Sequence, residues 1–397
     1  MFKSSNRIGE IIESETLAMT KRARELRESG KDIISLSIGE PDFNTPEHIC
    51  NAAYKAMQDG YTHYPPVTGL LPFRESISRK LKNENNLIYH PNEIIVSNGA
   101  KHSIINAVLS IVNPGDEVII PAPYWVSYPS MVAYAGGTSV YIAAGVDKGF
   151  KFSAVDLRNA ITPKTKLLIF SSPCNPSGSV FSENELQDIA NVLLENPHVF
   201  VISDEIYEKI NYVGKHVSIG SFPRMKERTA VVNGLAKGYA MTGWRIGYLA
   251  GPTWLISACE KIQGLFTSGA NSISQMAGIA ALEGDQQPIE EMRATFQKRR
   301  DFMLQKMSAI AGLKFNIPDG AFYVFPDVSY FFGKKFGEYT IHNAEQLCMY
   351  LLNEAGVATV SGTAFGLPEC IRISYATDFN SIEKAIDRMT EALAKLS

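Results

Sequence analysis

The sequence lacks any apolar run that could cross a membrane and any block of like charges. No stretch approaches the roughly 18 consecutive apolar residues that a membrane span needs. The opening MFKSSNRIGEIIESE also lacks the apolar core of a signal peptide. The 38 Lys and Arg residues balance 41 Asp and Glu residues, for a formal net charge of -3, with no basic arm or stripe. We therefore expect neither export, membrane insertion nor nucleic-acid binding.

Cysteine is scarce, and its spacing matches neither a disulfide framework nor a metal site. The five cysteines are odd in number and far apart, without a CxxC or Cys/His pattern. We expect no metal, and a reducing cytoplasm as the location. The cysteines are Cys50, Cys174, Cys259, Cys348 and Cys370.

The composition is that of an ordinary globular protein. Hydrophobic residues make up 45% and charged residues 20% of the 397 residues. At roughly 150 residues per domain, this length suggests two or three domains with a large core. The chain has no internal repeat or low-complexity linker, so domain boundaries follow only from changes in pattern.

Between about residues 93 and 251, short apolar runs alternate with helical stretches. This rhythm predicts an α/β fold whose mostly parallel, seven-stranded sheet has helices on both faces. Several runs end in polar or small residues, and ligands of open α/β sheets lie beyond the carboxyl ends of the strands. The runs are EIIVSNG (93–99), EVIIPAP (117–123), SVYIAA (139–144), KLLIFSSP (166–173), VFVISDE (199–205), TAVVNGL (229–235) and IGYLAG (246–251).

A second, smaller α+β unit is predicted after a long helix that begins near Pro288. Apolar residues recur there at spacings of three, four or seven from Ile289 to Ile310. Beyond them, 313–328, 358–366 and 370–376 are predicted strands, and 343–355 and 379–396 predicted helices. We expect residues 1–45 to form an N-terminal arm and part of the small domain, 46–287 the large domain, and 288–397 the interdomain helix and small domain.

The segment NGLAKGYAMTGWRIG (233–247) carries the clearest chemistry. Lys237 follows an apolar run, and Arg245 stands eight residues later. A lysine in a desolvated pocket has a lowered pKa and can attack an aldehyde as a neutral amine. An arginine can hold a phosphate through two parallel hydrogen bonds. An isolated Lys or Arg is more often a solvated surface residue, so neither identifies a site by itself.

This segment resembles the cofactor-lysine signature S-K-x-Y/F-x-M-T-G-W-R of the fold-type-I aminotransferases, which depend on pyridoxal 5'-phosphate. The resemblance runs from SIGEPDF (37–43) to IRISYAT (371–377), and it is closest to the one-beta subgroup of bacterial aspartate aminotransferases. It implies a large cofactor-binding domain in which Lys237 carries the cofactor as a Schiff base. Ala236 replaces the usual Ser, and Cys174 an Asn.

The same resemblance assigns the other cofactor contacts. Asp204 pairs with the pyridine nitrogen and makes the ring a better electron sink. Tyr207 and Asn175, in SDEIYE and SSPCNPSG, bind the phenolic oxygen. Small residues before a helix suit an anion, although such a turn alone is weak evidence. The residues implied around the phosphate are Gly99, Ala100, Lys101 and Arg245, with Trp125 of PAPYWVSYP stacked on the ring.

Tyr64 in THYPPVTG resembles the family's Y-x-x-x-x-G, since Gly69 has the required spacing. In the family this tyrosine reaches the phosphate bound by the neighbouring subunit. The resemblance therefore implies a homodimer with shared active sites.

Substrate binding is expected at Arg372 and Lys101. Arg372 stands in an apolar run and is costly to bury unless an anion meets it, although a structural salt bridge would serve equally. The resemblance implies that it holds the α-carboxylate, helped by Asn175, Trp125 and the backbone near Gly39. Lys101 begins a predicted helix, where a cation is unfavourable without an anion nearby. In the subgroup, this lysine and hydroxyls at Ser14 and Thr16 are associated with a distal carboxylate.

These features predict an aspartate:2-oxoglutarate aminotransferase that works by a ping-pong mechanism on an amino acid and a 2-oxo acid. A prephenate or aromatic amino acid aminotransferase, either of them possible alongside aspartate activity, is one alternative, and a carbon-sulfur lyase another. An aminotransferase-like binding module without activity is the third. That module normally has a separate DNA-binding domain ahead of the fold, whereas only about 35 residues precede SIGEPDF.

Overall fold

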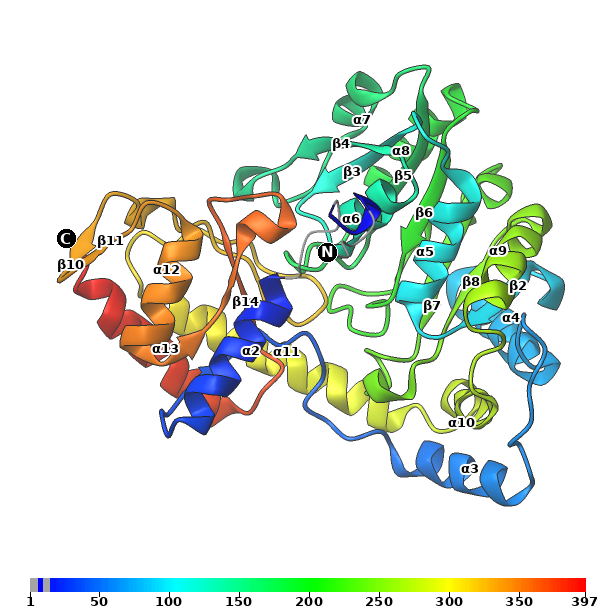
Figure 1. Cartoon of the computed structure of the whole chain (residues 1–397), viewed down its shortest axis with the longest axis horizontal. Helices are drawn as coiled ribbons and strands as arrows, with labels where there is room; N and C mark the ends of the chain where they lie inside the picture. Colours follow the sequence, from blue (N-terminus) through cyan, green and yellow to red (C-terminus); the bar gives the residue numbers. More distant parts are fainter. Residues whose placement is uncertain (1–5, 10–14) are drawn as a thin grey trace, which may run out of the picture.

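The computed structural model describes residues 6–9 and 15–397, which form two packed units joined by one long helix (Figure 1). A seven-stranded sheet, the large sheet, forms the centre of the first unit. A three-stranded sheet, the small sheet, lies in the second unit with α12 (Ala344–Tyr350) and α13 (Phe379–Ala394). Helix α11 (Gln287–Met307) runs between the units.

The large sheet has the strand order β2-β8-β7-β6-β5-β3-β4, and its strands match all seven predicted runs. The pairs among β4, β3, β5, β6 and β7 are parallel, whereas β8 is antiparallel to both of its neighbours. The predicted mostly parallel sheet is therefore confirmed. The strands are β2 (Ile94–Ser97), β3 (Glu117–Ala122), β4 (Thr138–Ala143), β5 (Thr165–Ser171), β6 (Phe200–Asp204), β7 (Thr229–Gly234) and β8 (Gly247–Ala250).

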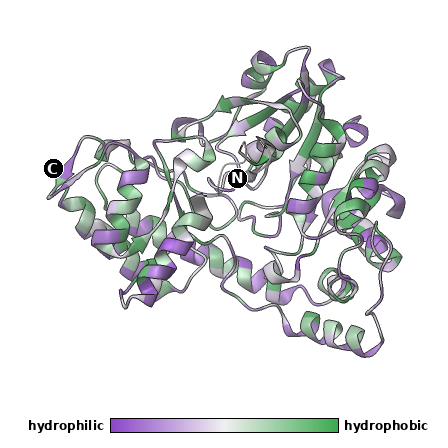
Figure 2. Cartoon of the chain, in the orientation of Figure 1, coloured by the Kyte–Doolittle hydropathy of each residue, from purple (hydrophilic) through white to green (hydrophobic). Residues whose placement is uncertain are grey.

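Helices cover both faces of this sheet, which explains the nearly continuous apolar runs. Because successive side chains point to opposite faces, Ile120 packs with α5, α6 and α9, whereas Ile119 packs with α7 and α8. Helices α3, α4 and α10 bury the β2 and β8 end. Figure 2 shows the strands largely green and the helices with green and purple sides. The helices are α3 (Glu47–Gln58), α4 (Leu71–Asn85), α5 (Ala100–Ile111), α6 (Ser127–Tyr134), α7 (Ala154–Ala160), α8 (Glu183–Glu195), α9 (Thr253–Phe266) and α10 (Ser272–Glu283).

The second unit is built from short strands. The small sheet has the order β13-β14-β9, all antiparallel, and a separate parallel pair joins β1 to β12. Its core includes residues of α11 and α13. The elements are α2 (Glu15–Glu28), β1 (Ile34–Ser35), β9 (Tyr323–Val324), the hairpin of β10 (Lys335–Phe336) and β11 (Tyr339–Thr340), β12 (Val357–Ala358), β13 (Val360–Ser361) and β14 (Ile371–Ser374).

The predicted strands of this unit were too long at two places. In 313–328, only β9 is a strand, since Pro318 and Gly320 interrupt the apolar pattern. In 358–366, residues Gly362–Phe365 form a 3-10 turn that ends at Gly366, whose φ is 85°. The predicted helix over 343–355 is α12 continued by a π-helical turn, Leu351–Ala355.

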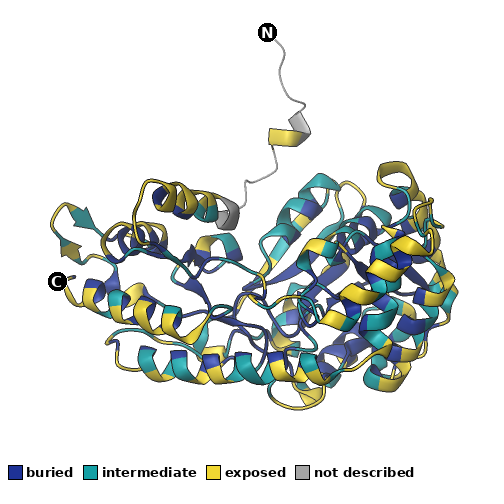
Figure 3. Ribbon diagram, turned by 90° about the horizontal axis from the view of Figure 1, so that it is seen from below, coloured by how far each residue is buried: buried dark blue, intermediate teal, exposed yellow. Residues whose placement is uncertain are grey.

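Figure 3 shows buried strands inside helices whose outward-facing sides are exposed. Within residues 6–9 and 15–397, no helix combines the length and apolar character that crossing a bilayer requires. Buried side chains of α11 belong to the cores of both units. Met292 packs with the helices of the large sheet, whereas Met303 packs with the small unit. This shared helix places the small sheet opposite the carboxyl ends of the large sheet's strands.

Candidate functional site

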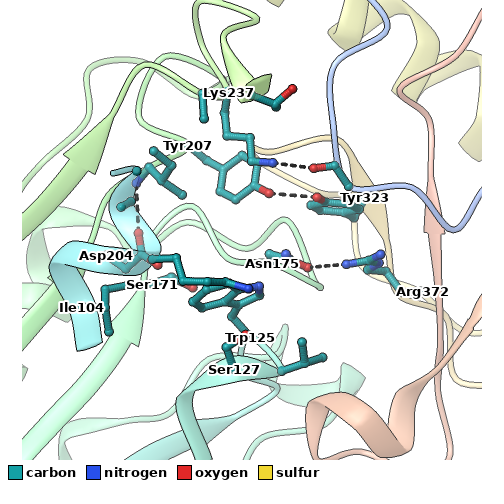
Figure 4. A pocket seen from close by; sticks show the side chains of 18 of the residues that line it. Ile104, Trp125, Ser127, Ser171, Asn175, Asp204, Tyr207, Lys237, Tyr323 and Arg372 are labelled. Atoms are coloured by element: carbon teal, nitrogen blue, oxygen red, sulfur yellow. Dashed lines mark hydrogen bonds between the residues drawn. The ribbon is translucent and has the colours of Figure 1, made fainter. Parts of the chain in front are cut away.

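A cavity of about 360 Å³ opens where the carboxyl ends of β5, β6 and β7 face the small sheet (Figure 4). Its volume suits a small ligand rather than a macromolecule. Most of its polar groups come from segments far apart in the sequence. The lining includes Gly39, Gly99, Ala100, Lys101, Trp125, Ser171, Asn175, Asp204, Tyr207, Lys237, Thr242, Arg245, Tyr323 and Arg372.

Lys237 supplies an amine to this cavity. It lies in the turn after β7, and its Nζ donates a hydrogen bond to the carbonyl of Gly39. Burial, and then the charge of Arg372, lower the pKa of the Lys237 amine to about 8. Roughly a tenth of the amine is therefore neutral at pH 7, and attack on an aldehyde requires this neutral form.

Asp204 supplies a buried carboxylate at the end of β6. It is only 5% exposed, and burial raises its pKa to about 6. Its Oδ2 accepts a hydrogen bond from the hydroxyl of Tyr128 at 2.7 Å, and its Oδ1 one from the backbone N-H of Ile206 at 3.3 Å. No Lys or Arg within the described residues forms an ion pair with it. The carboxylate is thus placed to meet a cationic ring nitrogen of a ligand.

The start of helix α5 borders one end of the cavity. Gly99 is the N-cap with φ of 85°, and no side chain caps the helix. The Arg245 guanidinium lies against it, so that a Cβ at Gly99 would come within 2.6 Å of Nη2. Thr242 and Asn98 carbonyls accept hydrogen bonds from that guanidinium at 2.9 and 3.3 Å. The helix N-terminus and the arginine therefore converge on a place that suits a phosphate.

Arg372 is a second cation, on β14 of the small sheet. It is 2% exposed, and it donates to Asn175 Oδ1 at 3.1 Å and to the carbonyl of Ser37 at 2.7 Å. Its Nε lacks a hydrogen-bond partner within the described chain, and no carboxylate there lies within ion-pair distance. These observations favour a ligand anion over the structural salt bridge that the sequence left open.

Lys101 and Trp125 form another wall. Lys101 Nζ lies 5.0 Å from the centroid of the Trp125 ring. Burial and the charge of Arg245 lower the pKa of Lys101. Trp125 also packs edge-on against Tyr128, with centroids 5.4 Å apart, and Figure 4 shows it on the side of the cavity opposite Lys237. The indole offers a flat face to a ring-shaped ligand.

Three of the predicted site residues are not seen in the cavity. Tyr64 is 95% exposed and lies outside the lining. Ser14 lies outside the described residues, and so does the side chain of Thr16, which belongs to the first turn of α2.

Sequence reasoning missed Tyr323 and Tyr128. Tyr323 lines the cavity, and its hydroxyl lies 2.8 Å from that of Tyr207. Tyr323 ends the segment GAFY (320–323), which the sequence predicts only as part of a strand. Tyr128 lies in PAPYWVSYP, where only Trp125 was given a role. A buried tyrosine in an apolar run reads as core unless its hydroxyl is known to need a partner.

The cavity residues together suit a phosphorylated aromatic aldehyde. A partly neutral amine, a buried carboxylate, a helix N-terminus with an adjacent arginine and an aromatic face all border one space. Arg372, with its unpaired Nε, leaves room for a second anion on the side of the small sheet.

Comparisons with known proteins agree with this reading. The family model for aminotransferase class I and II matches residues 31–389. An aspartate aminotransferase of Bacillus sp. (strain YM-2) is 47% identical over 387 residues, 97% of each chain. A Petunia hybrida protein named bifunctional aspartate aminotransferase and glutamate/aspartate-prephenate aminotransferase is 46% identical over 99% of this chain and 83% of its own. The crystal structure of the aspartate aminotransferase from Rhizobium meliloti has a TM-score of 0.97 and 42% identity, with both chains fully covered.

Proposed function

Because the chain belongs to the class I and II aminotransferases, which depend on pyridoxal 5'-phosphate, we propose that it transfers the amino group of aspartate to 2-oxoglutarate. The products are oxaloacetate and glutamate, formed in two half-reactions of a ping-pong cycle. One observation carries the proposal: the same cavity holds a partly neutral Lys237 amine and a buried Arg372 guanidinium. Arg372 has no carboxylate partner within the described chain. The relatives named aspartate aminotransferase support the choice of substrate.

Lys237 has two tasks in this proposal. Its amine would hold the cofactor by condensing with the aldehyde group, with release of water, and it would be freed when the substrate amine takes its place. The freed amine then moves a proton from the substrate α-carbon. The bound cofactor supplies an electron sink for that step. A pKa lowered to about 8 supports both tasks, since each needs the neutral amine.

The other cavity residues hold the cofactor. Asp204 faces the ring nitrogen, and its burial makes a cationic partner favourable. Tyr207 and Asn175 bind the phenolic oxygen, and Trp125 stacks on the ring. Around the phosphate we place Gly99, Ala100, Lys101 and Arg245.

The substrate is held by its carboxylates. Arg372 binds the α-carboxylate, with Asn175, Trp125 and the backbone of Gly39 beside it. Lys101 binds the distal carboxylate, with Ser14 and Thr16 as further contacts. Two fixed carboxylates orient the α C-H bond perpendicular to the cofactor ring, which is a positioning contribution to the rate.

We also propose a homodimer in which Tyr64 completes the phosphate site of the neighbouring subunit. Tyr64 is 95% exposed in the single chain, and Leu265 and Phe266 are 81% and 59% exposed. These residues are on adjoining segments, because Gln263 donates a hydrogen bond to the carbonyl of Val67 at 2.7 Å. Exposed aromatic and aliphatic side chains gathered in this way support a protein interface.

Two further assignments complete the proposal. The division into residues 1–45, 46–287 and 288–397 is supported by different hydrophobic cores at the two ends of α11. A cytoplasmic location is supported by the five cysteines, which all lie in the described part of the chain and form no disulfide bond there.

Prephenate is the second candidate substrate, since the Petunia relative is named for both activities. Lys101 supports it, because a compact and mobile ammonium can serve carboxylates at two positions better than a rigid guanidinium. An aminotransferase-like module without activity is not supported, given the partly neutral Lys237 amine in the cavity.

Half-reaction spectroscopy tests these assignments. Aspartate added to the cofactor-loaded enzyme should convert the bound cofactor to its aminated form within a single turnover. Prephenate is an amino acceptor, so its test begins from the aminated enzyme and follows the return of the original spectrum. If aspartate leaves the spectrum unchanged, aspartate is not the donor, and if prephenate leaves the aminated spectrum unchanged, the second activity is absent.

A further inference from the structure

Tyr323 joins the two units at the centre of the cavity. It is fully buried on β9 of the small sheet, and its hydroxyl lies 2.8 Å from that of Tyr207, which follows β6 of the large sheet (Figure 4). The absence of a side chain at Gly39 leaves room for the Tyr323 hydroxyl, because a Cβ there would come within 2.9 Å of it. The Arg372 guanidinium lies 4.6 Å from the centroid of its ring.

The direction of this hydrogen bond follows from the number of protons. A tyrosine hydroxyl has one proton to donate and can accept through its oxygen. When Tyr207 donates to the phenolic oxygen of the cofactor, its own oxygen is left as an acceptor for Tyr323. Chains of hydrogen bonds polarise one another, so a donor behind Tyr207 makes Tyr207 a stronger donor. Burial raises the pKa of both tyrosines, and the positive charge of Arg372 opposes this effect on both of them. The number of protons therefore sets Tyr323 as the donor.

We propose that Tyr323 is a positioning residue that donates to Tyr207 and thereby strengthens the hydrogen bond that Tyr207 gives to the phenolic oxygen of the cofactor. The proposal rests on the role of Tyr207 in the proposed function. The hydrogen bond from Tyr323 to Tyr207 also depends on the position of the small sheet, because Tyr323 belongs to β9. Tyr323 does not exchange a proton with substrate in this account.

The spectrum of the cofactor bound to Lys237 reports on this bond without any turnover. The absorbance of the bound cofactor changes with pH when the nitrogen that joins it to Lys237 loses its proton. The pKa of this nitrogen is lower when Tyr207 donates a hydrogen bond to the phenolic oxygen anion of the cofactor. Three charged groups face Tyr207 in the described chain, namely Arg372, Asp204 and Lys237. All three remain in the variants below, so a shift reports on the hydroxyl that is removed.

Tyr323→Phe should raise this absorbance pKa by about half to one unit, the effect of one lost hydrogen bond. The matched control is Tyr375→Phe. Tyr375 is also a buried tyrosine of the small unit, and its hydroxyl lies 3.3 Å from that of Tyr212, yet it does not line the cavity. The control should leave the pKa unchanged. A 3-fluorotyrosine at position 323 is a more acidic donor and should lower the pKa, which gives a second test with an opposite sign.

Tyr207→Phe separates this inference from the function on which it rests. If Tyr207→Phe raises the pKa and Tyr323→Phe does not, the relay through Tyr323 is wrong while the Tyr207 assignment stands. If neither variant moves it, the assignment of Tyr207 fails as well. An equal shift in Tyr323→Phe and Tyr375→Phe would mean that general loosening of the small unit is responsible, and it would also overturn the relay.

Discussion

Tyr128 donates a hydrogen bond from its hydroxyl to Oδ2 of Asp204 at 2.7 Å. Tyr128 is fully buried on α6, and its ring packs against the edge of Trp125. One side chain therefore orients both the carboxylate that we place at the ring nitrogen and the indole that we place on the ring face. It also opposes the effect of burial on the pKa of Asp204 and so favours the ionised form.

Tyr128→Phe should weaken binding of the cofactor about ten-fold, because it leaves a buried carboxylate short of one donor. The measurement is the dissociation constant of pyridoxal 5'-phosphate from the cofactor-free enzyme. Tyr124→Phe is the control, since Tyr124 belongs to the same segment but stacks on Tyr141 instead. Equal affinity in wild type and Tyr128→Phe would show that Asp204 does not depend on this bond.

Lys101→Met should reduce kcat/KM for aspartate about thirty-fold or more while changing it little for alanine, which has no distal carboxylate. Arg372→Met should reduce kcat/KM for aspartate and for alanine alike, because every amino acid has an α-carboxylate. Lys101 also lies near the proposed phosphate site, so cofactor must be kept saturating during the assays. Equal losses for aspartate and alanine in Lys101→Met would contradict a role in recognising the distal carboxylate.

The sequence was sufficient for the large sheet but not for the small unit. Long β-branched runs such as 199–205 could be recognised because both faces of the sheet are buried. In 313–328 the buried aromatic residues lie mostly in loops and turns on either side of a two-residue strand. The apolar content of this segment therefore reflects burial and not a long strand. The polar ends of the strands located the cavity. The hydroxyl contacts of Tyr128 and Tyr323 depend on tertiary approach, and no local pattern encodes them.

A buried ion pair lies directly behind the cofactor site. Glu205, the residue after Asp204, is 1% exposed and accepts hydrogen bonds from Ser203 at 2.9 Å, Ser218 at 2.6 Å and His216 at 2.9 Å. Burial by itself would lower the pKa of His216, but the adjacent Glu205 carboxylate outweighs it and raises that pKa. A histidine with a raised pKa stabilises the fold most fully at pH values below its unfolded pKa, and this stabilisation is lost as pH rises through the folded pKa.

His216→Gln should therefore destabilise the enzyme by about 3 kcal/mol below about pH 6, with a smaller loss at alkaline pH. Glutamine keeps a hydrogen-bond donor but cannot carry the charge. Denaturant unfolding of both proteins across this pH range measures the difference. A loss of the same size at every pH would show that the charge of His216 does not contribute.

Tyr64→Phe should weaken cofactor binding about ten-fold, although Tyr64 is 95% exposed in the single chain. The expected loss comes from the phosphate contact of the neighbouring subunit. Tyr330→Phe is the control, because Tyr330 is likewise exposed, at 52%, but belongs to the small unit. Sedimentation of the wild type should show a dimer; a monomer that binds the cofactor normally would contradict the shared site.

Lys237→Ala tests whether Lys237 carries the cofactor, with absorbance spectra and aspartate turnover recorded on one purified sample. Lys298→Ala, an exposed lysine on α11, is the control and should behave as wild type. We expect Lys237→Ala to have no turnover and to lack the absorbance of cofactor bound covalently to the enzyme. Survival of both turnover and that absorbance would show that Lys237 is not the residue that carries the cofactor.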